Sequence, residues 1–319
     1  MSSSEVAKLS KAPVLVIVGP TASGKSSLAV KMAKKYNGEI ISADSRAIYK
    51  YVDIASAKPT KKEQSGIIHW GIDIVGPSDF IVSAGKHSAS PFTVADFKKY
   101  AEEKIVDISS KGKLPIVVGG SGLYIDALIY GYKFNNSSGG IKKRPPTDAR
   151  KIYHDMSVQE LQDYCKNNNI KLPSNFNNKR YLIRAIEKFL DGETVTNDRK
   201  QIDSRYKVVG ITTKKEELGI KIAQRIDQML EDGLVEEYKK ISKIYHEDSE
   251  VLKSNAYIVV KKYLNNEIQN SELKAELVRL DKKLVKKQKT WFKRNEQIMW
   301  TNLDETPHKI DEILMPYNR

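Results

Sequence analysis

Residues 19–26 carry the clearest chemistry in the chain. They read GPTASGKS and match G-x-x-x-x-G-K-S, the pattern of a phosphate-holding loop, or P-loop. Its glycines let the backbone turn sharply, so that several peptide N–H groups can converge on one anion. Lys25 adds a positive charge, and Ser26 adds a hydroxyl that can hold Mg²⁺, the cofactor we expect. The residues predicted to bind a diphosphate here are Gly19, Thr21, Ala22, Ser23, Gly24, Lys25 and Ser26.

Two other polar side chains follow apolar runs. Asp44 comes directly after residues 39–43, and Ser121 follows residues 113–118 and a Gly-Gly pair. An acid at a strand end near a phosphate loop can bind a ribose or a metal ion, or act as a general base. Both side chains could equally do no more than cap a helix. On local sequence alone these alternatives stay open.

The elements that must position these residues read as buried strands and amphipathic helices. Continuous apolar runs are typical of strands in a parallel sheet covered on both faces. Such strands place their carboxyl ends along one edge, so residues 19–26, Asp44 and Ser121 should converge there. We expect strands at 14–18, 39–43, 113–118, 208–212 and 298–300, and helices at 27–36, 93–111, from 123 onward, 148–166, 177–191, 214–232, 234–246, 250–264 and 271–294.

This pattern predicts the α/β class, with a P-loop NTPase-like parallel sheet flanked by helices, a small helical insertion and a helical C-terminal region. Residues 79–92, rich in Ser, Ala and Gly, read as a loop. After Tyr132 a polar segment with Gly-Gly and Pro-Pro reads as a linker. We expect the first part of the core over residues 1–132, the insertion over 133–198, and the second part of the core over 199–319.

Positive charge is in excess and gathers near the C-terminus. The chain has 54 Lys and Arg against 40 Asp and Glu, a net charge of +14. Such an excess indicates a polyanionic partner such as nucleic acid, unless it only keeps a lysine-rich chain soluble. Residues 282–294 place many lysines around Trp291 and Phe292. We expect Leu284, Gln288 and Trp291 to face inward and the lysines to follow a phosphate backbone, although a merely solvated helix is the alternative.

The cysteine count and the hydropathy of the chain indicate the cellular compartment that we expect. Cys165 is the one cysteine, which rules out an internal disulfide and a cysteine-based zinc site, and fits a reducing cytoplasm. The first twelve residues lack an apolar signal region, and no apolar run is long enough to span a membrane. We expect a cytoplasmic monomer without a membrane partner.

Seven segments along the chain carry a family resemblance. They are GPTASGKS, SADSRAIYK, DIASAKP, VVGGSGLYIDAL, RAIEKFLDG, QRIDQMLEDGLVEE and KKQKTWFKR. In this order they resemble the tRNA dimethylallyltransferases, and the similarity runs over nearly all of residues 13–303. The resemblance implies transfer of a dimethylallyl group from dimethylallyl diphosphate to N6 of the adenosine 3′ of the anticodon, position 37, with release of diphosphate. The tRNA anticodon arm would be the macromolecular partner.

The resemblance also implies roles for individual residues. Asp44 aligns with the family's general base, Ser121 with a hydroxyl at the diphosphate or the target base, and Lys25 with the charge that meets the leaving group. Lys221 or Arg225 would contact the diphosphate, and residues 133–198 would bind tRNA. The implied tRNA contacts are Asp44, Ser45, Arg46, Ala47, Ser121, Arg150, Arg180, Arg184, Tyr257, Lys286, Lys287, Gln288, Lys289, Trp291 and Lys293.

Several positions depart from the family's usual pattern. Tyr181 replaces the first arginine of an Arg-x-x-Arg pair, with Arg180 beside it, and Lys221 replaces an arginine. Asn255-Ala256-Tyr257 stands for Ile-Gly-Tyr, and DIASAKP for DIGTAKP. Residues 81–91 read as an insertion.

Three other functions remain open at this point. A P-loop small-molecule kinase would fill the loop with ATP and use Asp44 to activate a hydroxyl. An adenylate isopentenyltransferase would act on free nucleotide, and neither of these enzymes needs the helix that ends KKQKTWFKR. A non-catalytic RNA-binding protein would not need an intact P-loop together with Asp44.

Overall fold

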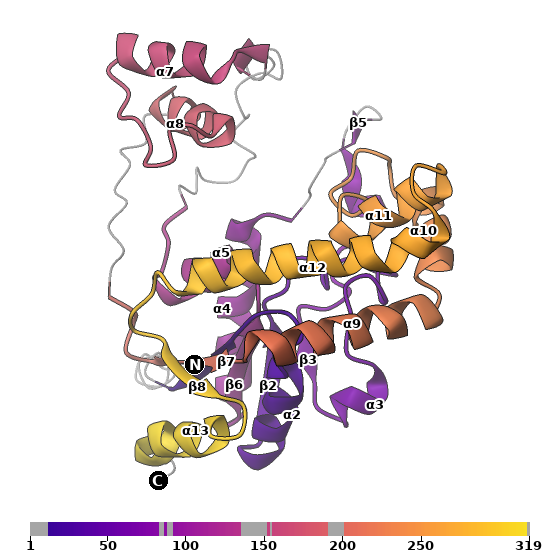
Figure 1. Ribbon diagram of the computed structural model, residues 1–319. Coiled ribbons are helices and arrows are strands. Elements are labelled where there is room, and N and C mark those ends of the chain that lie inside the picture. Colours follow the sequence, from indigo (N-terminus) through magenta and orange to yellow (C-terminus); the bar gives the residue numbers. More distant parts are fainter. Residues whose placement is uncertain are drawn as a thin grey trace. The chain divides into compact units, whose positions relative to one another are not determined.

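The computed structural model describes residues 12–82, 86–87, 92–134, 152–153, 155–190 and 201–317 (Figure 1). The chain divides into two compact units, one formed by residues 1–132 and 201–319 and the other by residues 133–200. Arg150, an implied tRNA contact, lies outside the described residues. In the described part of the chain no helix combines the length and apolarity needed to cross a bilayer.

The first unit is built on a parallel sheet, as the apolar runs predicted. Its strand order among the described residues is β3-β2-β6-β1-β7-β8 (Figure 1). Val18 of β1 pairs with Gly119 of β6, and Ser42 of β2 pairs with Val118. The carboxyl ends of these three strands therefore lie side by side, which confirms the predicted α/β architecture. The strands are β1 (Val14–Val18), β2 (Gly38–Ser42), β3 (His69–Trp70), β6 (Leu114–Gly119), β7 (Tyr206–Thr212) and β8 (Met299–Asn302).

Helices cover both faces of this sheet. One face packs against α4 (Val94–Ser110) and α5 (Gly122–Ile129) through a core that includes Phe97, Ile105 and Ile125. The other face packs against α2 (Lys25–Lys35) and α13 (Thr306–Leu314). Burial on both faces explains why these strands read as unbroken apolar runs.

A second core in the same unit is formed mainly by helices. It joins residues 48–52 to α9 (Lys215–Glu231), α10 (Leu234–Ile244), α11 (Asn255–Leu264) and α12 (Asn270–Phe292). Gly233, in the left-handed conformation with φ of 93°, separates α9 from α10, between the helices expected at 214–232 and 234–246. Helix α12 also packs against α5, so the long basic helix reaches the sheet edge where the P-loop lies (Figure 1).

The second unit contains α7 (Val158–Asn167) and α8 (Lys179–Leu190). Their shared core includes Leu161, Leu182 and the free, buried Cys165. Arg180, Tyr181 and Arg184 lie on the exposed side of α8.

Local hydrogen bonds explain where the elements differ from expectation. Helix α11 starts at Asn255 rather than near residue 250, because Ser254 Oγ accepts from the Tyr257 N–H and caps it. A two-stranded hairpin, β4 (Ile81–Val82) and β5 (Lys86–His87), lies where a loop was expected. Not predicted were α3 (Lys61–Gln64), the 3₁₀ turns η1 (Pro77–Phe80) and η3 (Met315–Tyr317), and α13.

Two glycines provide opposite tests of this packing. A methyl group on Gly122 would overlap the Trp291 ring, which α12 presses against the start of α5. We expect Gly122→Ala to destabilise the protein by about 1–3 kcal/mol. Gly219, inside α9, has open space where a Cβ would project, so Gly219→Ala should stabilise by about 0.5–1 kcal/mol. Urea unfolding of both variants measures the two effects, and a neutral Gly122→Ala would contradict the close approach of α12.

Candidate active site

A pocket of about 150 Å³ lies at the carboxyl edge of the sheet. It brings together the P-loop, the end of β2, the end of β6 and a loop at residues 56–59, and Arg225 of α9 also reaches it. Its lining includes Thr21, Ala22, Lys25, Ser26, Asp44, Ala47, Ala57, Pro59, His69, Ile72, Gly119 and Arg225. The predicted convergence of the P-loop and Asp44 is thus present.

The P-loop is shaped by its own backbone and by α12. Gly24 has a φ of 84°, a left-handed conformation that suits glycine and starts α2. The first-turn N–H groups of a helix have no acceptor in that helix, so the start of α2 offers donors and a positive dipole end to an anion. The Thr21 N–H is already used, because it donates to Gln288 Oε1 at 2.9 Å.

Gln288 therefore bridges two loops of the site. While its Oε1 accepts from the P-loop, its Nε2 donates to Gly120 O at 3.2 Å. Gln288 was predicted to face inward, and it does. The polar atoms of its side chain serve the P-loop and the β6–α5 turn.

Lys25 and Arg225 both reach the pocket, but their electrostatic surroundings differ. Burial lowers the pKa of Lys25 to about 8, although Asp44 opposes that shift and Arg225 reinforces it. Lys25 Nζ donates to Pro20 O at 3.2 Å. Arg225 forms an ion pair with Asp281 of α12, whose pKa is raised by burial and partly restored by Arg225.

Asp44 and Ser121 are not helix caps. Residues 45–48 form turns, and Asp44 Oδ1 accepts from the Arg46 N–H at 2.8 Å. Ser121 stands at the N-cap position of α5 but makes no side-chain cap bond there. Its Oγ instead accepts from the Ser45 N–H at 3.0 Å and lies 3.2 Å from Ser45 Oγ. The two strand ends are thus joined beside the pocket.

Other predicted site residues lie apart from the pocket or deep in the fold. Lys221 does not line the pocket; it pairs with Glu217 on its own helix at 2.6 Å, which leaves Arg225 as the cation at this wall. The side chain of Tyr257, an implied tRNA contact, is 0% exposed, and its hydroxyl donates to Glu237. Arg46 is held by Glu250, and Gly19 and Ser23 are buried beneath the loop surface.

The basic helix α12 has one face toward the protein and one toward solvent. Lys286, Lys287 and Lys293 are exposed. Lys289 is half-buried and donates to Thr213 O, and the Trp291 indole N–H donates to Asp126 at 2.9 Å. Aromatic and amide groups thus fasten α12, while lysines remain available on its outer face.

Mg²⁺ has a small but suitable set of protein ligands here. Ser26, exposed at the start of α2, and Asp44 both line the pocket. Within the described ranges no group of three or more His, Cys, Asp or Glu side chains could hold a metal by itself. Mg²⁺ keeps several waters and is commonly bound by one or two protein oxygens with substrate phosphates, so this donor set fits it.

Three residues at the site were not among the predicted site residues. Asp281 is an acid within a lysine-rich run, a signal that could have indicated a buried ion pair. Lys58 lies in DIASAKP and lines the pocket, but its ammonium is bound within the protein. His69 lines the pocket, and burial lowers its pKa.

Comparison with known proteins places this geometry in a family. Residues 47–295 match the family described as IPP transferase. A tRNA dimethylallyltransferase of Acetivibrio thermocellus is 37% identical over 301 residues, covering 92% of each chain. One from Staphylococcus haemolyticus is 33% identical, over 98% of this chain and 93% of that protein.

Comparison with solved structures leads to the same family. The tRNA isopentenylpyrophosphate transferase of Bacillus halodurans matches with a TM-score of 0.68 and 31% identity, over 96% of both chains. A eukaryotic dimethylallyltransferase acting on tRNA matches the fold with a TM-score of 0.76 at 21% identity, over 97% of this chain and 80% of that one. By sequence and by fold, the chain therefore belongs to the IPP transferase family, the family of the tRNA dimethylallyltransferases.

Proposed function

We propose that this protein transfers a dimethylallyl group from dimethylallyl diphosphate to N6 of the adenosine at position 37 of tRNA, next to the anticodon, and releases diphosphate. The observation that carries the proposal is the pocket that gathers Lys25, Asp44 and Arg225, with the basic helix α12 fastened to its P-loop. The cations of the pocket suit a diphosphate leaving group, and the lysines of α12 suit a polyanionic acceptor.

The cations of the pocket act on the leaving group. Lys25, the start of α2 and Arg225 offset the charge that develops on the diphosphate as the C1–O bond breaks. Ser26 and the substrate's own phosphate oxygens would hold Mg²⁺, which when bound supplies further positive charge to the leaving group. Lys58 is not part of this set, because its ammonium is bound to protein oxygens.

Asp44 acts on the acceptor. The exocyclic amine of adenosine is a weak nucleophile, so a carboxylate that orients it and takes its proton aids the formation of the N6–C1 bond. Asp44 Oδ1 is held by the Arg46 N–H, which fixes the carboxylate at the pocket wall. Ser121 sits close by and is our proposal for a hydroxyl contact to the substrates.

The anticodon arm must be held outside the pocket while its base enters. A base inside a stack has to be extruded before a base-modifying enzyme reaches it, and loop bases cost the least. The exposed Lys286, Lys287 and Lys293 would hold phosphates, as would Arg180 and Arg184 of the second unit. A monomer in the cytoplasm remains our prediction for its state and compartment.

The alternative enzymes suit the molecule less well. An adenylate isopentenyltransferase or a small-molecule kinase has no need for the exposed lysines of α12. Family membership also favours the tRNA enzyme, because the relatives match over nearly the whole chain.

Lys25 should couple prenyl-donor binding to pH. With a pKa of about 8, Lys25 is largely neutral in the free protein above that pH, and a bound diphosphate would restore its charge. Binding at about pH 8.5 should therefore take up about three quarters of a proton, and affinity should fall as pH rises through 8. Calorimetry of dimethylallyl diphosphate binding in buffers of different ionisation enthalpy measures this uptake. Lys25→Met is the control and should abolish it; equal uptake in both proteins would exclude Lys25.

Replacing Asp44 should slow the chemical step. Asp44→Asn keeps the shape but removes the base, and we expect kcat to fall by roughly 10²–10⁴-fold. The tRNA affinity should change far less. Asp107→Asn, an exposed acid on α4 paired with Lys111, is the matched control and should keep normal turnover. Near-normal turnover by Asp44→Asn would show that Asp44 is not the general base and only stabilises the turn.

The α12 lysines should matter for tRNA and not for the prenyl donor. Replacing Lys286, Lys287 and Lys293 with Gln should raise KM for tRNA and flatten its log–log salt dependence by about 0.7–0.9 per lost phosphate contact. KM for dimethylallyl diphosphate should stay unchanged.

A triple Gln variant of Lys239, Lys240 and Lys243, exposed on α10, removes the same charge elsewhere. Equal effects of the two triple variants on tRNA binding would mean that only net charge matters. That result would refute the proposed contact between α12 and tRNA.

A further inference from the structure

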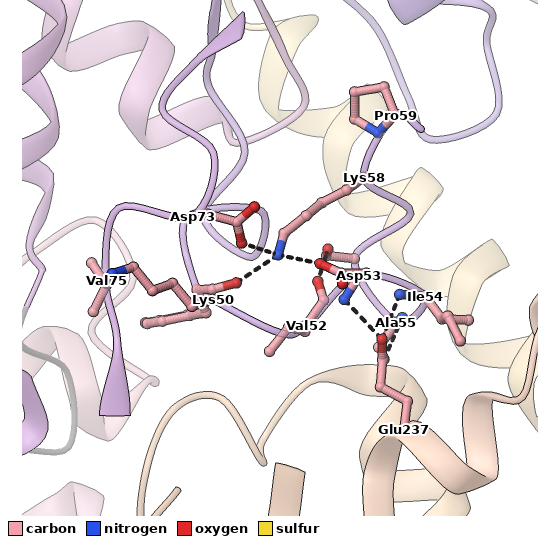
Figure 2. A network of polar contacts seen from close by, with 12 residues as sticks. Lys50, Val52, Asp53, Ile54, Ala55, Lys58, Pro59, Asp73, Val75 and Glu237 are labelled. Atoms are coloured by element: carbon pink, nitrogen blue, oxygen red, sulfur yellow. Dashed lines mark hydrogen bonds and ion pairs between the residues drawn. The ribbon is translucent and has the colours of Figure 1, made fainter. Parts of the chain in front are cut away.

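The loop of residues 52–59, here the pocket loop, is held from two sides before it reaches the pocket (Figure 2). Ser56, Ala57, Lys58 and Pro59 from this loop line the pocket. Ala57 has a φ of 48°, a left-handed conformation that a non-glycine residue keeps only where its surroundings hold it. What holds the pocket loop therefore determines the shape of this wall.

The inner anchor is one carboxylate from α10. Glu237 accepts hydrogen bonds from three successive backbone N–H groups, those of Asp53 at 2.8 Å, Ile54 at 2.6 Å and Ala55 at 2.9 Å (Figure 2). Successive N–H groups that converge in this way form an anion-binding concavity. Glu237 is 9% exposed, and the buried Tyr257 hydroxyl donates to it at 2.7 Å. Four donors thus converge on one buried carboxylate.

The outer anchor is Lys58. Its ammonium donates to Tyr49 O at 2.7 Å, to Asp53 Oδ1 at 2.7 Å and to Asp73 Oδ1 at 2.6 Å (Figure 2). A lysine has three N–H donors, so this set uses all of them. Lys58 therefore ties the pocket loop to residues 49 and 73. Inside the loop the Ala57 N–H donates to Ile54 O and the Lys58 N–H to Asp53 O, which leaves the N–H groups of residues 53–55 to Glu237.

Two of the four residues that the pocket loop adds to the lining, Ala57 and Pro59, are apolar. The other two have their polar groups bound within the protein, because the Ser56 hydroxyl donates to Val52 O and the Lys58 ammonium donates to three oxygens. Ala57 and Pro59 line the same pocket as Ala47 and Ile72, whereas the P-loop supplies the N–H groups and Lys25. A diphosphate suits the P-loop part of the lining, and a five-carbon hydrocarbon suits the apolar part. This assignment rests on the proposed function, because it takes dimethylallyl diphosphate as the ligand.

We propose that Glu237 is a positioning residue for the prenyl donor: by filling the N–H concavity of residues 53–55, its carboxylate sets the apolar wall against which the dimethylallyl group lies. Glu237 touches neither substrate. Its loss should therefore weaken recognition of the hydrocarbon while the P-loop continues to bind phosphate.

The test compares dimethylallyl diphosphate with inorganic pyrophosphate, which lacks the hydrocarbon. In Glu237→Gln one acceptor oxygen becomes an N–H₂ donor that opposes the loop N–H groups. We expect the Kd of dimethylallyl diphosphate to rise by about tenfold or more, with that of inorganic pyrophosphate changed by less than about twofold. Glu236→Gln, an exposed neighbour on α10, should leave both constants unchanged. Equal weakening of both ligands, or of neither, would overturn the proposal.

Tyr257→Phe provides a second variant in case Glu237→Gln does not unfold cooperatively. It removes one of the four donors at nearly constant volume, and the Kd of dimethylallyl diphosphate alone should rise by about two- to fivefold. An unchanged Kd in this variant would overturn the proposal by itself.

Hydrogen exchange separates this inference from the proposed function. The amides of residues 53–55 should exchange faster in ligand-free Glu237→Gln than in wild type, and at the wild-type rate in Glu236→Gln. Unchanged exchange would refute the anchor. A wild-type protein that binds no dimethylallyl diphosphate would refute the proposed function instead, whatever the exchange shows.

Discussion

The bridge made by Gln288 is the interaction on which the site depends. One amide accepts from the Thr21 N–H of the P-loop and donates to Gly120 O beyond β6, although it lies 267 residues from Thr21 in the chain. The register of the parallel sheet brings those two loops together, and glycines at 120 and 122 allow α12 to approach. A helix with exposed lysines is thereby fixed to the P-loop.

The charged side chains of the pocket are held in place by their neighbours. Burial lowers the pKa of Lys25 to about 8, and a bound diphosphate would stabilise its charged form. Arg225 is held by Asp281 of α12, so the same helix also fixes a second cation of the pocket. Asp44 is fixed by backbone hydrogen bonding at the end of β2. In the proposed reaction, the pocket would therefore meet the leaving group with cations and the acceptor amine with a carboxylate.

Much of the fold was predictable because burial on both sides of a parallel sheet leaves unbroken apolar runs such as residues 14–18. The G-x-x-x-x-G-K-S pattern located one side of the pocket for a similar reason: its backbone shape demands those residue types. The hydrogen bonds that Glu237 and Gln288 make were not predicted, because most of their partners are backbone groups, which leave no mark in the sequence. The contact between the Tyr257 hydroxyl and Glu237 in the core was not predicted either, because nothing in the local sequence pairs residues on two different helices.

The central claim is that one pocket transfers a dimethylallyl group to an adenosine presented by tRNA. Its most direct test offers the purified protein dimethylallyl diphosphate, Mg²⁺, tRNA and AMP together, followed by mass spectrometry of the digested RNA and of the free nucleotides. The account predicts N6-dimethylallyl adenosine at position 37 of tRNA and unmodified AMP. Modified AMP with unchanged tRNA would contradict it, because the lysines of α12 would then have no substrate to hold.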